Sequence, residues 1–278
     1  MPNSADDSRN RLHGTVRLGD FLGRIAARLH LALRLGYRAA EKPPCVRKHL
    51  GEKREMKLPI RIHDLSQPVF TNCPQYPDEN PRPAQIRLFY MIAVKGVNKE
   101  IVELSTHTGT HCDAPYHFFE EGATIDQIPL ETYIGRATIL DLRDKKAGSA
   151  IERTDIERFA MRIAEGDIVL LNTGWGHKRA NTKEFLTEYV YLSGEAAQYL
   201  VSRGIKGVGI DAVSLGGYND PSKAVPPHKT MLGNGKFIVE ELHFPDEIMD
   251  GKERLFVAAP VKLQGAGGAW TRAMLWEY

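Results

Sequence analysis

Cysteine is scarce in this chain. Only Cys45, Cys73 and Cys112 occur among its 278 residues, and no two of them have the Cys-x-x-Cys spacing. Three thiols cannot all pair with one another, so the sequence argues against a small scaffold held together by disulfides. Free cysteines are typical of a reducing compartment, and we therefore expect a cytoplasmic protein.

Long hydrophobic runs and a strong charge excess are also missing. The sequence has no run of about 18 apolar residues, and no apolar segment near its start leads to a small-residue cleavage site, so we expect neither a membrane span nor a secretory signal. The formal net charge is +2. Such a small excess gives no basic surface for a polyanion, and we expect no nucleic-acid partner.

The positive charge that exists is concentrated at the start of the chain. About twelve Lys and Arg against six Asp and Glu precede Met56, and leucines and arginines at helical spacing over residues 21–35 predict a basic amphipathic helix. It could be a targeting or membrane-surface helix, or a helix that docks on a partner subunit. We favour a weakly ordered extension over residues 1–55, followed by a working domain over residues 56–278, with Pro43-Pro44 near the boundary.

The remainder of the sequence mixes strand and helix patterns. Helices are expected over residues 154–164 and after Ser193, which has the position of an N-cap. A turn through Gly96 could pair two β-rich segments as a hairpin. The expected strands are residues 58–65, 86–94, 99–104, 138–142, 168–172, 207–211, 237–240 and 255–261. The fold class predicted is α/β, with a mixed sheet.

The most informative segment is His-Thr-Gly-Thr-His-Cys-Asp-Ala-Pro-Tyr-His, residues 107–117. Two imidazoles and a carboxylate from His107, His111 and Asp113 would suit zinc, manganese or iron(II). A straight strand separates residues four apart by about 13 Å, whereas ligands bonded at about 2 Å to one ion must lie closer together. The chain must therefore curl between the histidines, and Gly109 is the residue able to adopt a positive φ. A set of ordinary surface or core histidines is the competing interpretation.

This segment resembles the signature of the cyclase-type metal-dependent hydrolases, which include bacterial kynurenine formamidases, isatin hydrolases and certain dienelactone hydrolases. Weaker similarities occur in the expected order over roughly residues 60–275, among them Thr173-Gly174-Trp175, Gly209-Ile210-Asp211 and Gly267-Gly268. The resemblance implies a single swivelling β/β/α-type domain, which usually forms a homo-oligomer. We expect a homodimer or a homotetramer.

The resemblance also implies roles for individual residues. His107, His111 and Asp113 would hold a first metal ion, and Asp113 would bridge to a second. His228 and Glu240 match the distal ligand pair of the family. Glu241 is the rival candidate for Glu240.

His117 matches the acid/base histidine of the family, and its ordinary pKa near neutrality suits that role. Two departures from the family pattern concern its neighbourhood. Pro77-Asp78 follows Tyr76 where formamidases usually have Pro-Gly-Asp, which bears on formylkynurenine specificity. Cys112 replaces a residue that is usually aliphatic, and strand parity predicts that it faces away from the metal as a core cysteine.

These features predict a metal-dependent hydrolase that uses one or two divalent ions, zinc or manganese, on a small aromatic or cyclic substrate. The best single substrate is N-formylkynurenine, cleaved at its amide C–N bond to kynurenine and formate. A ring-opening hydrolase of an isatin-like lactam or a dienelactone is the alternative, as is a metal-binding member of the family without catalysis. The candidate aromatic residues for a substrate pocket are Phe70, Tyr76, Phe118 and Trp175.

Overall fold

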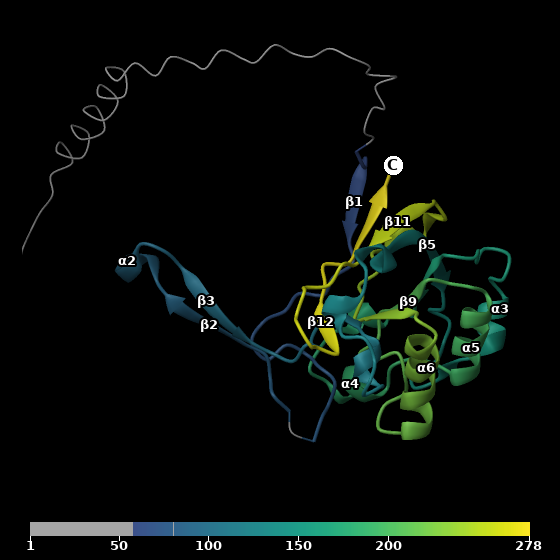
Figure 1. Cartoon of the computed structure of the whole chain (residues 1–278), viewed down its shortest axis with the longest axis horizontal. Coiled ribbons are helices and arrows are strands. Elements are labelled where there is room, and N and C mark those ends of the chain that lie inside the picture. The colour runs from purple at the N-terminus through teal and green to yellow at the C-terminus, as the bar shows by residue number, and fades with distance from the viewer. Residues whose placement is uncertain (1–57, 80) are drawn as a thin grey trace, which may run out of the picture. The chain divides into compact units, whose positions relative to one another are not determined.

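The computed structural model describes residues 58–79 and 81–278. The predicted basic helix, Cys45 and the proposed boundary near Pro43-Pro44 lie outside these residues. The described part of the chain belongs to one compact unit, residues 56–278. This unit is an α/β domain built on one mixed sheet (Figure 1).

The sheet has nine strands in the order β1, β13, β11, β5, β7, β9, β10, β4 and β12. The four strands in its middle, β5, β7, β9 and β10, run parallel to one another. The strands on both sides of this parallel core pair in antiparallel fashion. The strands are β1 (Arg61–Asp64), β4 (His111–Asp113), β5 (Ile134–Asp141), β7 (Ile168–Asn172), β9 (Gly207–Ile210), β10 (Phe237–Glu240), β11 (Arg254–Val257), β12 (Gly268–Trp270) and β13 (Met274–Glu277).

The parallel strands consist almost entirely of apolar residues because both faces of the sheet are covered. In β7, Val169 and Leu171 pack into a core cluster on the helical side, whereas Ile168 and Leu170 pack into a second cluster on the other side. Residues of β11, β12 and β13 join this second cluster. The sheet therefore curls around one of its own faces and leaves the other face to the helices.

Helices pack on the first of these faces. α5 (Gly194–Ser202) begins at the predicted N-cap, where the hydroxyl of Ser193 accepts a hydrogen bond from the backbone N–H of Ala196 at 3.1 Å. It packs against α6 (Pro221–Gly233) and α3 (Arg153–Glu157). The predicted helix over residues 154–164 was too long, because α3 ends at Glu157 and turns follow it.

Smaller elements complete the domain. β2 (Gln85–Tyr90) and β3 (Lys99–Glu103) form the predicted hairpin, with the short helix α2 (Ile92–Lys95) between them. β6 (Ala150–Ile151) and β8 (Tyr191–Leu192) form a second small sheet. The remaining helices are α4 (Lys183–Thr187) and the 3-10 helices η1 (Pro115–His117), η2 (Ile125–Gln127), η3 (Leu130–Tyr133), η4 (Trp175–Lys178) and η5 (Asp246–Asp250). Among the helices in the described ranges, none has the length and hydropathy needed to cross a membrane.

Candidate metal centre

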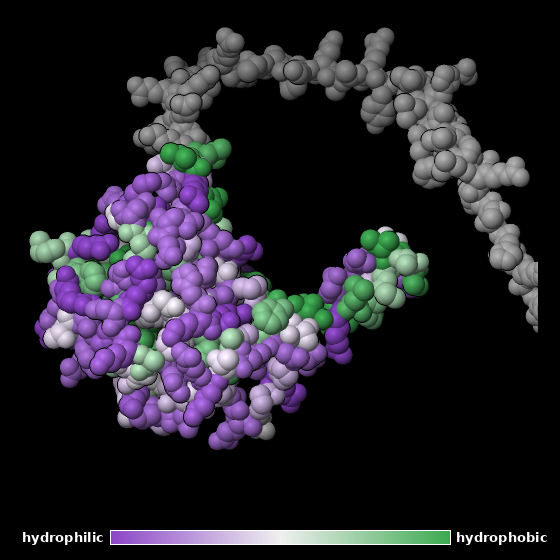
Figure 2. Space-filling model, turned by 180° about the vertical axis from the view of Figure 1, so that it is seen from behind, coloured by the Kyte–Doolittle hydropathy of each residue, from purple (hydrophilic) through white to green (hydrophobic). Residues whose placement is uncertain are grey.

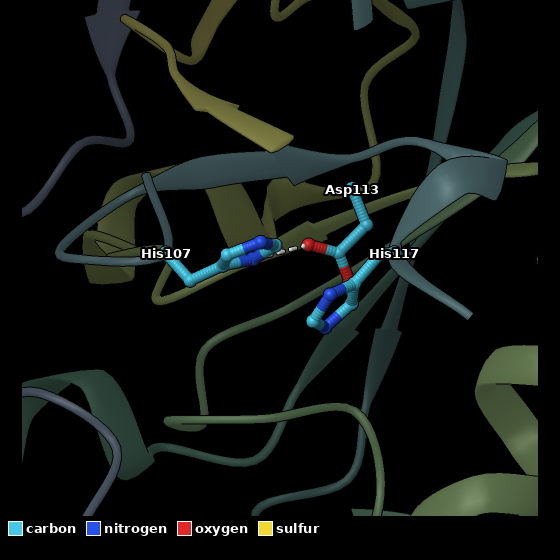
Figure 3. A group of neighbouring side chains, drawn as sticks. All are labelled: His107, Asp113 and His117. Carbon is cyan, nitrogen blue, oxygen red and sulfur yellow. Dashed lines mark ion pairs between the residues drawn. The ribbon is translucent and has the colours of Figure 1, made fainter. Parts of the chain in front are cut away.

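The chain curls at the predicted position and then enters the sheet as β4. Gly109 adopts a φ of +68°, and a Cβ at this position would lie only 2.8 Å from Cγ2 of Val69. This turn returns His107 toward Asp113, so that the His107 Nδ1 atom lies 2.9 Å from Asp113 Oδ1 (Figure 3). A glycine is required here because any side chain would be both strained and obstructed.

The register of β4 and β10, together with helix α6, brings further side chains to the same point. Glu240 on β10 lies directly opposite His111 on β4, and both residues are buried. The His111 Nε2 atom lies 3.4 Å from one oxygen of Asp113 and 3.4 Å from one oxygen of Glu240. Helix α6 adds His228, whose Nε2 atom lies 3.0 Å from Glu240 Oε1. β4 is thus brought together with α6 and β10, which follow it by more than 100 residues in the sequence.

Backbone carbonyl groups fix the tautomers of the two buried imidazoles. The His111 Nδ1 atom lies 2.8 Å from the carbonyl oxygen of Gly109, and the His228 Nδ1 atom lies 2.7 Å from that of Ala224. A carbonyl oxygen can only accept a hydrogen bond, so each Nδ1 carries the hydrogen. In its neutral form each ring then presents the lone pair of Nε2 to the carboxylates, the arrangement found around metal-ligating histidines.

The electrostatics of the two acids favour their ionised forms. Burial would raise the pKa of Asp113, but the close imidazoles of His107 and His111 hold this pKa well below its usual range. Burial and the charge of Asp113 would raise the pKa of Glu240, yet His111 and His228 lower it to about 2. The centre therefore holds two buried carboxylates that are ionised at neutral pH.

A divalent cation fits this donor set. Asp113 Oδ1, Asp113 Oδ2 and His111 Nε2 are buried atoms that make no properly oriented hydrogen bond. Burial would lower the pKa of His111, but Asp113 and Glu240 raise it well above its usual range. Without an ion, the proton that His111 holds balances the charge of the carboxylates, and a divalent cation would displace it. Ligand atoms of His111, Asp113 and Glu240 lie within 4.8 Å of one another, as do those of His107, Asp113 and His117. The described residues thus offer two overlapping groups of three ligands that share Asp113.

Glu241 points elsewhere and does not compete with Glu240. Its Oε2 accepts a hydrogen bond from Arg179 Nε at 2.9 Å, and its backbone has a φ of +52°. Arg179 in turn donates to the carbonyl oxygen of Pro68 at 2.9 Å. Through Arg179, the Glu241 side chain therefore links the loop after β1 to the sheet. Burial raises the pKa of the Glu241 carboxyl group.

His117 lies at the surface of the cavity beside the acids. Its ring stacks on that of His107, with 4.0 Å between the ring centroids (Figure 3). Burial among neighbouring groups lowers the pKa of His117 to about 4, so that its ring is neutral at pH 7 and can accept a proton. A ring nitrogen of His117 also lies within 4.8 Å of ligand atoms of His107 and Asp113.

A cavity of about 600 Å³ opens onto this centre. Tyr76 and Phe118 line it, as expected. Trp175 does not, because it is buried in the core on the helical side, where its indole N–H donates to the carbonyl oxygen of Phe185 at 3.0 Å. Phe70 is not among the lining residues either; the guanidinium carbon of Arg179 lies 5.8 Å from its ring centroid. The sequence pattern placed four aromatic residues at the pocket, and the structure places two.

The sequence analysis assigned no role to several residues that support the ligands. A Cβ on Gly268 would lie 2.6 Å from Cε1 of His107, so this glycine leaves the space that the imidazole occupies. The backbone N–H of Leu215 donates to Glu240 Oε1 at 2.6 Å, and the Ser214 hydroxyl donates to the same oxygen at 3.3 Å. Gly267-Gly268 was a visible signal in the sequence, but nothing in the sequence indicated the contacts of residues 214 and 215.

The alternation of side chains along β4 determines the side of the sheet on which Cys112 lies. It is completely buried in the cluster opposite the helices, whereas His111 and Asp113 face the candidate metal centre. Its thiol donates to the carbonyl oxygen of Ala258 at 3.2 Å, and burial raises its pKa well above the usual range. Cys112 is therefore a core cysteine, as predicted.

Comparison with protein families gives a match over residues 63–216 to a family described as "Putative cyclase". A kynurenine formamidase from Bacillus thuringiensis (strain Al Hakam) is 30% identical over 212 residues, which span 76% of this chain and 95% of that protein. The family match over residues 63–216 includes the whole motif from His107 to His117.

Solved structures give concordant results. A protein described as a potential metal-dependent hydrolase with cyclase activity superposes with a TM-score of 0.64 at 31% identity, over 78% of this chain and 98% of its own. Isatin hydrolase A from Labrenzia aggregata, bound to benzyl benzoate, superposes with a TM-score of 0.70 at 23% identity, over 78% of this chain and 93% of its own. At that identity the second likeness concerns the fold.

Proposed function

Because the chain belongs to the family described above, we propose that it is a metal-dependent hydrolase that cleaves an amide C–N bond, with N-formylkynurenine as its substrate. The observation that carries this proposal is the set of buried, unpartnered ligand atoms of His111 and Asp113 beside an open cavity. The similarity to a kynurenine formamidase over nearly the whole of that protein supports the substrate.

His107, His111 and Asp113 would hold one divalent ion, zinc or manganese, and Asp113, His228 and Glu240 would hold a second. A divalent cation bound there would supply Lewis acidity toward a carbonyl oxygen and would lower the pKa of water. The protein contributes the orientation of the ligands. Leu215 and Ser214 hold Glu240 in place, and the carbonyl groups of Gly109 and Ala224 hold the two imidazoles.

His117 would transfer the proton. Hydrolysis of an amide joins the oxygen of water to the carbonyl carbon, breaks the C–N bond and requires that the departing nitrogen gain a proton. The neutral ring of His117 lies at the cavity wall, where it can take a proton from water and deliver it to that nitrogen.

The cavity suits a small aromatic substrate. Tyr76 and Phe118 supply flat apolar surfaces, and the Phe118 ring stacks on His228 with 4.7 Å between the centroids. Phe118 would thereby place an aromatic substrate next to the ligands. Arg82 also lines the cavity and provides a positive charge for an anionic group on the substrate.

The substrate proposal is tested by incubating metal-loaded protein separately with N-formylkynurenine, isatin and a dienelactone, and following absorbance. We expect the fastest turnover with N-formylkynurenine. Faster opening of isatin or of the lactone would reject the formamidase assignment and keep the hydrolase. Absence of turnover of all three substrates by protein with full metal content would favour a metal-binding protein without catalysis.

The site assignment is tested by two substitutions. Asp113→Ala should lose bound metal, measured by elemental analysis, together with activity. His117→Ala should retain the metal and lose turnover by about 10²- to 10⁴-fold. Full metal content in the Asp113 variant would reject the proposed centre, and unchanged turnover in the His117 variant would remove that residue from the reaction.

A further inference from the structure

A buried ion pair lies beside the turn of residues 107–111, here called the histidine turn. The Arg179 Nε atom donates to Glu241 Oε2 at 2.9 Å, and the two side chains are only 6% and 1% exposed. A Cβ on Gly109 would lie 3.9 Å from Arg179 Nη2, so the guanidinium group is close to the point where the chain curls. A buried ion pair is weak evidence for a role in stability, because desolvation of both charges offsets their attraction. The other contacts of Arg179 indicate a different role.

Arg179 also holds both ends of a segment that leads into the cavity wall. Its Nη1 atom donates to the carbonyl oxygen of Pro68 at 2.9 Å, and its Nη2 atom donates to that of Pro74 at 3.4 Å. The segment continues directly into Gln75 and Tyr76, which line the cavity, and residues 68–76 are here called the wall loop. The guanidinium group offers its donors in a rigid planar fork, so one side chain can hold a carboxylate and two carbonyl groups at once.

The wall loop is joined to the rest of the cavity through Gln75. Its amide nitrogen donates to the carbonyl oxygen of Arg82 at 3.1 Å, and its amide oxygen accepts a hydrogen bond from the Thr108 hydroxyl at 3.5 Å. Thr108 is completely buried in the histidine turn, and Arg82 lines the cavity. Gln75 thus connects two other parts of the site, and the course of the wall loop determines where it lies.

The hairpin of β2, α2 and β3 follows the wall loop and projects from the domain (Figure 1). Its strands make their main element contacts with each other within the described ranges, and hydrophobic side chains lie at its outer end (Figure 2). The hairpin therefore gives the wall loop little support from the sheet. Asn181, two residues after Arg179, donates to the carbonyl oxygen of Asn72 at 2.6 Å. The chain that follows η4 thus holds the wall loop from the side of the domain.

We propose that Arg179 is a positioning residue that holds the wall loop against the histidine turn, so that Gln75 and Tyr76 contact the substrate beside the candidate metal centre. This inference rests on the proposed function, because it assigns a role in the reaction of that site. The imidazoles of His111 and His228 are held by backbone carbonyl groups, and Arg179 makes its hydrogen bonds elsewhere. Loss of the fork should therefore weaken substrate binding and leave the metal and the chemical step unchanged.

Steady-state kinetics of the full chain separate binding from chemistry. Arg179→Lys keeps a charge opposite Glu241, but the compact ammonium group cannot hold the carboxylate and both carbonyl groups. With whichever of the three test substrates wild type hydrolyses, the lost hydrogen bonds should raise KM about 10-fold. The value of kcat should stay within about 3-fold of wild type, and elemental analysis should show full metal content.

Lys178→Gln is the matched control. Lys178 belongs to the same short helix, η4, and its ion pair with Glu184 lies at the surface, where both side chains are half exposed. This substitution removes a neighbouring cation without touching the wall loop, so KM, kcat and metal content should all equal those of wild type.

A second variant serves if circular dichroism shows that Arg179→Lys is poorly folded. Arg179→Gln/Glu241→Gln removes both charges together, so no buried charge is left unpaired. The glutamine side chain is too short to reach both carbonyl groups of the wall loop. We expect the same rise in KM with the same metal content.

Hydrogen–deuterium exchange gives a readout that needs no substrate. In the wall loop, the Asn72 N–H donates to the carbonyl oxygen of Ala84 at 2.8 Å, and the Cys73 N–H donates to that of Phe70 at 2.9 Å. Peptides that contain these amides should exchange faster in the Arg179 variants than in wild type or the control, because the loop opens more often. Peptides from β10 should exchange at the same rate in all of the proteins.

Three results would overturn the proposal. One is an unchanged KM in a folded Arg179 variant. Another is a joint loss of metal and kcat, which would make Arg179 a support of the ligands. The third is equal exchange of the wall loop in all of the proteins. Absence of turnover by metal-loaded wild type would instead reject the proposed function, and the exchange experiment would still show whether Arg179 holds the wall loop.

Discussion

The missing side chain of Gly268 determines how His107 can lie. Gly268 is the neighbour of Asp113 across the β4–β12 pair, at the strand that closes this edge of the sheet. A Cβ there would lie 2.6 Å from His107 Cε1 and 2.9 Å from the carbonyl oxygen of Cys112. The backbone oxygen cannot move without disturbing β4, so the imidazole would have to give way.

We predict that Gly268→Ala weakens metal binding about 10- to 100-fold while the fold is retained, as is usual when the support of a metal ligand is disturbed. Titration with zinc under competition from a chelator measures the affinity. Gly233→Ala is the control, since its Cβ would meet only the ring edge of Phe119 at 3.1 Å, away from the centre. An affinity equal to that of wild type would show that His107 does not need this space.

For single residues, the sequence predicts part of the geometry of the motif. The turn at Gly109 follows from spacing and bond length, because no straight chain gathers His107 and Asp113 around one ion. The choice between Glu240 and Glu241 does not follow from the sequence. It depends on a backbone φ of +52° and on Arg179, which lies 62 residues away in sequence.

Among the elements, β7 and β10 have the predicted bounds, since a buried parallel strand is a short apolar run between turns. Helix α6, which carries His228, was not among the predicted helices. Pro226 and Pro227 stand inside this helix and interrupt its hydrogen bonds, so local propensity argues against it. Packing of Met231 and Leu232 into the helical core offsets this cost. Tertiary contacts therefore place a candidate ligand where the local pattern indicates a loop.

Helix α5 supports α6, and its first turn offers a test of that support. We predict that Ser193→Ala lowers the free energy of unfolding by about 1 kcal/mol, because the backbone N–H of Ala196 loses its acceptor. Urea denaturation measures the change. Ser202→Ala, at the other end of the same helix, removes a hydroxyl that donates to the Tyr199 carbonyl oxygen and caps no N–H, so it should change stability by less than about 0.5 kcal/mol. Equal effects of the two substitutions would contradict the capping role.

At the scale of the whole molecule, the sheet separates two tasks. The side of the sheet formed by β10, β4 and β12 carries the candidate metal centre. The other, where β1, β13 and β11 adjoin, carries a network of ion pairs centred on Glu277. Its carboxylate lies 2.7 Å from Lys252 Nζ, 2.9 Å from Arg254 Nη2 and 3.3 Å from His63 Nε2. The candidate metal centre and the Glu277 network are thus far apart in strand order. We therefore expect that a substitution in one leaves the other intact.

The network makes stability depend on pH in a defined direction. Hydrogen bonds from Lys252, Arg254 and His63 lower the pKa of Glu277 to about 2 from its ordinary value of 4.5. A carboxyl group whose pKa is lower in the folded state stabilises that state above the unfolded pKa, and this contribution disappears as pH falls toward about 2. We predict that Glu277→Gln is less stable than wild type at pH 7 and that the difference shrinks between pH 4.5 and 2, measured by urea denaturation at each pH. Glu120→Gln, an exposed position outside this network, should follow wild type throughout. A difference between Glu277→Gln and wild type that stays constant over this range would mean that the ion pairs contribute nothing to the acid limb of the stability curve.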